Sequence, residues 1–181
     1  VLARVPGDAP ITLLDVGTGL GDLPAAAVRW GQRHGRLITP LGLERSHVAA
    51  ALAASHGVPT TVADAGMPPF RDGAVDVVLL SQVAHHFAPR SIVQLVRTCD
   101  RIARIGVVIA DLRRSPFAAA GFWFGAHALG FDRVTRTDGI TSVRRGFTPD
   151  ELCRILADAG VTARVERRPG FRIVATWTRA A

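Results

Sequence analysis

A carboxylate and three glycines lie together near the start of the chain, in LLDVGTGLGD, residues 13–22. Asp15 ends a short apolar run, and Gly17, Gly19 and Gly21 follow it at alternate positions. Glycine is used where the backbone takes a positive φ or passes close to another group. In a strand-to-helix turn, such glycines let the backbone approach a nucleotide-like ligand. The stretch therefore predicts a ligand-binding loop.

Two further acids follow the next two apolar runs. Glu44 comes directly after Leu37–Leu43, and Asp64 comes after Val58–Ala63. In a parallel sheet, ligands bind beyond the carboxyl ends of the strands. Glu44 is then placed to accept hydrogen bonds from two ribose hydroxyls, and Asp64 to contact an adenine edge. The alternative, that these are solvated loop carboxylates, is disfavoured by their recurrence at three successive strand ends.

The spacing of the glycines separates two classes of cofactor. Dinucleotide sites use G-x-G-x-x-G, with the pyrophosphate on a helix N-terminus. Here the spacing is G-x-G-x-G, and Asp15 and Asp22 flank the loop. A carboxylate at Asp15 would repel a pyrophosphate but suits the ammonium and sulfonium groups of S-adenosyl-L-methionine, which is the cofactor we expect.

A histidine pair, His85 and His86, follows the fourth apolar run in AHHF. A neutral imidazole there could remove a proton from a bound acceptor. Packing is an equally good explanation of the pair; of the two we favour His86 as the base. Asp111, after the fifth run, is a candidate substrate contact. The sequence offers no second carboxylate to complete a metal site beside it, so we expect no metal.

Residues 112–147 interrupt the regular pattern and are rich in aromatic and arginine side chains. A structureless loop of this length is unusual unless it is functional, and Ser115–Gly130 can form an apolar helix. We interpret the segment as a lid, with Phe122, Trp123 and Phe124 contacting the acceptor. An extra core helix is nearly as good an explanation. A helix lying in a membrane interface fits less well, because its apolar residues surround the helix rather than lining one face.

Strand-like and helix-like segments alternate along the chain, which predicts βαβ units and a mostly parallel sheet. We expect one α/β domain over residues 1–181: a Rossmann-like, doubly wound, seven-stranded sheet with an antiparallel C-terminal strand. The expected strands are Ile11–Val16, Leu37–Leu43, Val58–Ala63, Val75–Leu80, Ile105–Ala110, Val161–Val165 and Arg172–Thr178. The expected helices, besides the one in the interruption, are Leu23–His34, Ser46–His56, Ser91–Ile102 and Thr148–Ala159.

These residues resemble the class I S-adenosylmethionine-dependent methyltransferases. LLDVGTGLGD is similar to the family's first motif, and ADAGMPPFRDGAVDVVLLSQVAHHF, residues 63–87, is similar to a signature of its small-molecule branch, which includes quinone-biosynthesis enzymes. The sequence departs from that pattern at Pro68, Val75 and Arg45. The resemblance implies methyl transfer to a small aromatic or lipophilic acceptor, at oxygen or carbon. The cofactor-binding residues that it implies are Asp15, Gly17, Thr18, Gly19, Gly21, Glu44, Arg45, Asp64, Ala65 and Ser81.

Composition sets the remaining expectations. The net charge is +7, but all 22 basic residues are scattered arginines, which we attribute to a GC-rich coding bias. The lack of lysine excludes a lysine-dependent ribose methyltransferase, and the chain has no N-P-P-aromatic stretch, so nucleic acid is disfavoured as substrate. A cofactor-binding partner subunit without its own activity remains an alternative. We expect a cytoplasmic protein with reduced cysteines and no membrane span, and leave a homodimer open.

Overall fold

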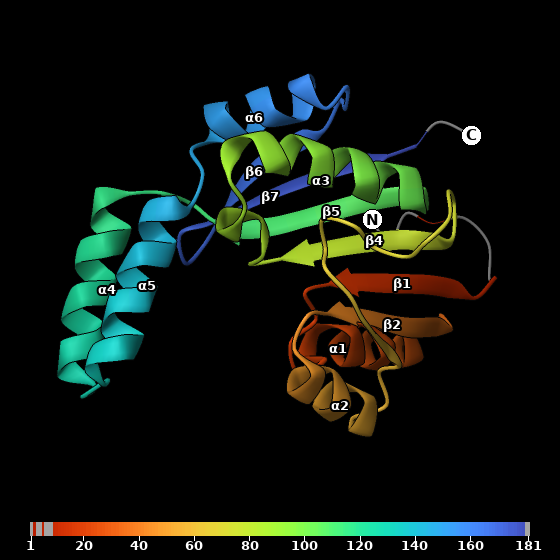
Figure 1. Ribbon diagram of the computed structural model, residues 1–181, viewed down its shortest axis with the longest axis horizontal. Helices are drawn as coiled ribbons and strands as arrows, with labels where there is room; N and C mark the ends of the chain where they lie inside the picture. The colour runs from red at the N-terminus through yellow and green to blue at the C-terminus, as the bar shows by residue number, and fades with distance from the viewer. Residues whose placement is uncertain (1, 3–4, 6–8, 180–181) are drawn as a thin grey trace.

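The computed structural model describes residues 2, 5 and 9–179, and its centre is a seven-stranded sheet (Figure 1). The strands follow the order β3-β2-β1-β4-β5-β7-β6, with β7 alone running antiparallel to its two neighbours. This confirms the predicted fold class. The strands are β1 (Ile11–Val16), β2 (Ile38–Glu44), β3 (Thr60–Val62), β4 (Val75–Ser81), β5 (Ala103–Leu112), β6 (Arg164–Arg168) and β7 (Arg172–Thr178).

Helices cover both faces of the sheet (Figure 1). Successive side chains of a strand point to opposite faces. In β1, Leu14 and Val16 join the large core under α3 and α6, whereas Ile11 and Leu13 join a smaller core with α1. The helices are α1 (Asp22–Arg33), α2 (His47–Ser55), α3 (Pro89–Ile102), α4 (Pro116–Ala128), α5 (Arg133–Arg145) and α6 (Pro149–Asp158), and the short 3-10 helix η2 (Ala84–His86) follows β4.

Local sequence signals explain where several helices begin. The Ser46 hydroxyl caps α2 by accepting a hydrogen bond from the Ala49 amide. At α6, Thr148 and Glu151 form a reciprocal capping box that satisfies two amides of the first turn. These two caps set the entry of the chain into the helices.

Residues 112–147 form two helices rather than one. The expected apolar helix is α4, but the sequence analysis missed α5, which Asp132 caps by accepting from Val134 and Thr135. The two helices pack side by side and project beyond the end of the sheet, at the left of Figure 1. Gly139 of α5 allows this approach, because a Cβ there would collide with the Phe122 ring.

The C-terminal hairpin is shifted from its predicted position. We expected Val161–Val165, whereas β6 spans Arg164–Arg168. Pairing with β7 sets this register, and Arg168 lies opposite Arg172 at the turn. β6 is an edge strand rich in arginine, so its apolar residues were a poor guide to its limits.

Candidate functional site

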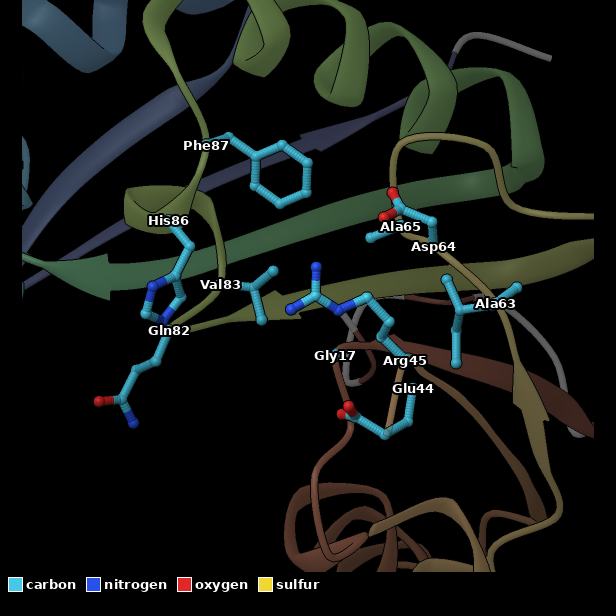
Figure 2. Close-up of a pocket in the computed structure, with 11 residues that line it drawn as sticks. Gly17, Glu44, Arg45, Ala63, Asp64, Ala65, Gln82, Val83, His86 and Phe87 are labelled. Atoms are coloured by element: carbon cyan, nitrogen blue, oxygen red, sulfur yellow. The ribbon is translucent and has the colours of Figure 1, made fainter. Parts of the chain in front are cut away.

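A cavity of about 570 Å³ opens at the carboxyl ends of β1, β2, β3 and β4 (Figure 2). Five residues predicted to bind a cofactor line it: Gly17, Glu44, Arg45, Asp64 and Ala65. We call it the first cavity. Its position at the carboxyl edge, near the reversal of strand order, is where open α/β sheets bind ligands.

The glycine loop is held tightly against its neighbours. Its first two amides, those of Gly17 and Thr18, donate to the Leu43 carbonyl at 2.7 and 3.1 Å. Gly17 has a φ of 72°, and a Cβ there would collide with Val83. Close packing of Val83, as well as space for a ligand, therefore requires glycine at this position.

Glu44 connects the loop to the end of β2. Its Oε2 accepts from the Gly19 amide at 3.0 Å, and its Oε1 accepts from the Ser46 amide at 2.9 Å. Each carboxylate oxygen can accept more than one hydrogen bond. Glu44 is thus fixed in orientation and still has capacity for two hydroxyl donors from a ligand in the first cavity.

Asp15 is buried at the end of β1 with an unsatisfied oxygen. Its Oδ1 and the Thr18 hydroxyl have no hydrogen-bond partner within the described part of the chain. Burial raises the pKa of Asp15 from 3.8 to about 7, the nearby Thr18 hydroxyl opposes the rise, and the charge of Glu44 adds to it. A buried carboxyl without a partner is costly to ionise, so the position favours a cationic group that would supply the missing interaction.

The far wall of the first cavity is more open. Asp64 is exposed, and its Oδ1 accepts from the Gly66 amide at 2.7 Å, which shapes the turn after β3. Arg45 is also exposed, and Figure 2 shows its side chain directed into the cavity toward Val83. Both residues border a space, between the ends of β2 and β4, that could hold a flat ring.

Five other residues predicted to bind the cofactor do not line the first cavity. Asp15 lies near the end of β1, Thr18, Gly19 and Gly21 belong to the glycine loop, and Ser81 ends β4. The sequence analysis missed five lining residues: Leu43, Ala63, Gln82, Val83 and Phe87. The proximity of Val83 and Phe87 to the histidine pair in the sequence was the signal that could have identified them. Gln82 has a φ of 55°, and a positive φ cannot be predicted from a glutamine in the sequence.

His85 and Asp111 form a buried pair. His85 Nδ1 lies 2.7 Å from Asp111 Oδ1, and the His85 amide donates to Oδ2 at 3.2 Å. Asp111 is 0% exposed, so it does not reach an acceptor directly, and its predicted role as a substrate contact is corrected. Asp111 thus holds the His85 ring at Nδ1 and leaves Nε2 as the other polar atom of the ring.

His86 lies on the boundary between the first cavity and a second one. Its ring centroid is 4.1 Å from that of His85, and it lines both cavities. Partial burial, followed by the neighbouring His85, lowers the pKa of His86; Asp111 opposes this shift and Arg145 adds to it. The lowered pKa favours the neutral form of His86, and its position gives the ring access to both cavities.

The second cavity, of about 810 Å³, lies between η2, α3, α6 and the end of α5. Phe87 and Phe147 supply its aromatic wall. The predicted acceptor contacts Phe122, Trp123 and Phe124 line neither cavity. Phe122 packs on Gly139, and Trp123 and Phe124 are 46% and 67% exposed near the middle of α4. Residues 112–147 instead line the second cavity only near their two ends, through Arg114 at one end and through Arg144, Arg145, Gly146 and Phe147 at the other.

Within residues 2, 5 and 9–179, no group of three or more His, Cys, Asp or Glu side chains could hold a metal ion. In the same part of the chain, no helix is both long and apolar enough to cross a membrane.

A family model described as a methyltransferase domain matches residues 14–111, more than half of the chain. The chain belongs to this family. No curated protein sequence matches it. The matched residues run from the end of β1 to the end of β5, and they include the glycine loop, Glu44, Asp64 and the histidine pair.

Solved structures agree with this assignment at the level of the fold. A SAM-dependent methyltransferase from Aquifex aeolicus is 16% identical, with a TM-score of 0.64 over 95% of this chain and 84% of that one. Magnesium protoporphyrin IX methyltransferase from Synechocystis PCC 6803, solved with bound SAH, is 13% identical, with a TM-score of 0.63 over 98% and 77%. A Haloferax volcanii protein solved with the Trm112 methyltransferase activator is 17% identical, with a TM-score of 0.67 over 97% and 84%.

The fold is that of the class I methyltransferases, and the chain is an S-adenosylmethionine-dependent methyltransferase. The residues present fit this cofactor. Asp15 offers an unsatisfied buried oxygen to a cation, and Glu44 offers a fixed carboxylate to hydroxyl donors.

Proposed function

We propose that this chain transfers a methyl group to a small aromatic or lipophilic acceptor, at oxygen or carbon, with His86 as the base. The position of His86 on the wall shared by the two cavities carries this proposal. One cavity then holds the methyl donor and the other the acceptor, and the proton leaves the acceptor beside the point of transfer. Methyl transfer to an oxygen needs that proton removed, because a neutral phenol attacks poorly.

In this proposal the acids and glycines at and beside the first cavity have defined tasks. Asp15 and the loop from Gly17 to Gly21 hold the methionine part of the cofactor, and Glu44 holds its ribose. Asp64 and Ala65 border the adenine. The cofactor supplies an electrophilic methyl group on its sulfonium, so the protein needs only to align the acceptor, exclude water and remove a proton.

Calorimetry and methyl transfer together test the proposal. We expect binding of S-adenosylmethionine and S-adenosylhomocysteine but not of NAD, and transfer of labelled methyl to members of a panel of phenols, quinols and lipophilic acids. Tight NAD binding would overturn the cofactor assignment. Cofactor binding with no transfer to any small acceptor would favour the partner subunit, and transfer to RNA would favour a nucleic-acid methyltransferase.

The pH dependence of cofactor affinity tests the role of Asp15. Its pKa of about 7 means that the free protein must ionise this carboxyl before it can pair with the ammonium. Affinity for S-adenosylhomocysteine should therefore fall up to about tenfold between pH 7.5 and pH 6, because each unit below a pKa reduces the ionised fraction about tenfold. Asp15→Asn should bind weakly and lose this dependence.

The pH dependence of unfolding provides a second test of the raised pKa of Asp15. Because its pKa is raised in the folded state, the native protein binds this proton more tightly than the unfolded chain. The unliganded protein should lose stability as the pH rises from about 4 to 7, and Asp15→Asn should lose less. An identical pH dependence of unfolding in Asp15→Asn and the wild type would contradict the raised pKa.

A further inference from the structure

We propose that the second cavity binds an acceptor carrying a carboxylate or a similar oxyanion, which Arg144 and Arg145 hold beside His86. This inference rests on the proposed function and names the substrate class of that same site. It makes the acceptor an amphiphile: an apolar body with one negatively charged group.

The charge of the cavity wall is unbalanced. Four arginines line it, Arg114, Arg144, Arg145 and Arg154, against two acids, Glu151 and Asp158. Arg114 forms an ion pair with Glu151, so these two charges compensate each other. Asp158 can offset one of the three remaining cations, which leaves an excess of positive charge in the cavity.

Arg144 and Arg145 are the cations available to a ligand. Among the described residues, neither has a hydrogen bond or ion pair with another side chain, whereas Arg154 donates to the Asp150 carbonyl at 3.3 Å. A guanidinium presents a planar set of donors that matches a carboxylate or phosphate, often through two parallel hydrogen bonds. Two adjacent free guanidinium groups on a cavity wall are a site for an oxyanion.

The other side of the same cavity is apolar. Phe87, Ile92, Val93, Phe147 and Ile155 line it. Such side chains favour burial of a hydrophobic body but give no hydrogen bonds to a charged one. The cavity therefore matches a ligand with distinct apolar and anionic parts better than a purely polar or a purely apolar ligand.

Backbone hydrogen bonds hold the arginines at this position. The Phe147 amide donates to the Leu112 carbonyl at 2.9 Å, and the Arg114 amide donates to the Phe147 carbonyl at 3.0 Å. These bonds join the end of α5 to the end of β5, and α5 packs against η2. The electrostatic influence of Arg145 on His86 agrees with this proximity. An anion bound there lies next to the proposed base.

Arginines in the last turn of a helix also interact favourably with its dipole. That role would stabilise α5 without distinguishing a charged ligand from a neutral one of the same shape. The two roles can therefore be separated by comparing ligands that differ only in charge.

The test uses the chain of residues 1–181 and two anions, 1-naphthoate and decanoate, each compared with its neutral amide. We expect the wild type to bind at least one of the two anions about tenfold more tightly than its amide, a preference that falls as salt rises. The double variant Arg144→Gln/Arg145→Gln should lose this preference, while Arg145→Gln alone should reduce it. Glutamine retains a high helix propensity, so α5 should persist in both variants.

The matched control is Arg133→Gln/Arg136→Gln, which removes the same charge from the same helix outside the cavity. The control should keep the full preference for the anion. Equal affinities for anion and amide in the wild type, no binding of either anion, or equal losses in both double variants would each overturn the inference.

Binding of S-adenosylhomocysteine, measured on the same samples, separates this inference from the proposed function. If S-adenosylhomocysteine binds and the anion preference is missing, the acceptor class is wrong and the methyltransferase assignment stands. If S-adenosylhomocysteine does not bind, the proposed function fails, while the anion titrations still report on the second cavity.

Discussion

Replacement of His86 by alanine is expected to lower turnover at pH 7 by about 10²–10⁴-fold on a phenolic acceptor, the usual contribution of a positioned general base. The affinity for S-adenosylhomocysteine should not change, because Glu44, Asp15 and the glycine loop are untouched. Raising the pH toward about 10, where a phenol ionises by itself, should restore part of the rate. The measurement is a pH–rate profile of both proteins on one acceptor.

The lowered pKa of His86 also fixes the acid side of that profile. A histidine whose pKa lies below its usual 6.5 keeps its neutral, basic form to lower pH. The midpoint of the acid limb should therefore lie below pH 6.5 in the wild type, and His86→Ala should lack this limb. Arg145→Gln removes one cause of the shift and should move the limb toward higher pH.

Two further variants identify which histidine acts. His47→Ala changes an exposed histidine that lines neither cavity and should retain full activity. Asp111→Asn removes the carboxylate that holds the His85 ring, so a strong loss of rate in this variant but not in His86→Ala would assign the base to His85. Full activity at pH 7 of both His86→Ala and Asp111→Asn would reduce the histidine pair to packing and leave alignment as the main contribution.

The parallel part of the fold and the first cavity were predictable from the sequence because the signals are local. β1 and β4 consist mostly of apolar residues, as expected for strands buried on both faces. Glu44 directly follows such a run, so its place at the carboxyl edge follows from the strand assignment alone. The glycine loop was also predictable, because its residues are consecutive and directly follow β1.

The second cavity was not predictable because distant segments build it. His85 meets Asp111 across 26 positions, and the end of α5 meets η2 only after the chain has passed through two helices. α5 itself gave a weak signal: Arg133–Arg145 contains β-branched threonines and Gly139, which have low helix propensity. The aromatics of α4 were conspicuous in composition, but nothing local indicated that they would lie outside the site.

Replacement of Glu44 by alanine is expected to weaken cofactor binding by about 2–4 kcal/mol, the cost of losing two charge-assisted hydrogen bonds to ribose hydroxyls. This corresponds to roughly 30- to 1000-fold in Kd. The Gly19 and Ser46 amides also lose their acceptor, so part of the effect comes from a less ordered loop. The fold should persist, since Glu44 lies at the partly exposed end of β2 and no core residue depends on it.

Calorimetric titration of S-adenosylhomocysteine into Glu44→Ala, Glu44→Gln and a control measures this effect. Glu44→Gln keeps an acceptor oxygen without the charge, so its loss should be smaller than that of alanine. Glu166→Ala is the control, because it removes a carboxylate of β6 that is paired only with Arg164 and Arg168 and lies outside both cavities. If Glu44→Ala bound as tightly as Glu166→Ala, the ribose would be held elsewhere. In that case Asp64 would be the next acid to replace, since it is the remaining carboxylate on the wall of the first cavity.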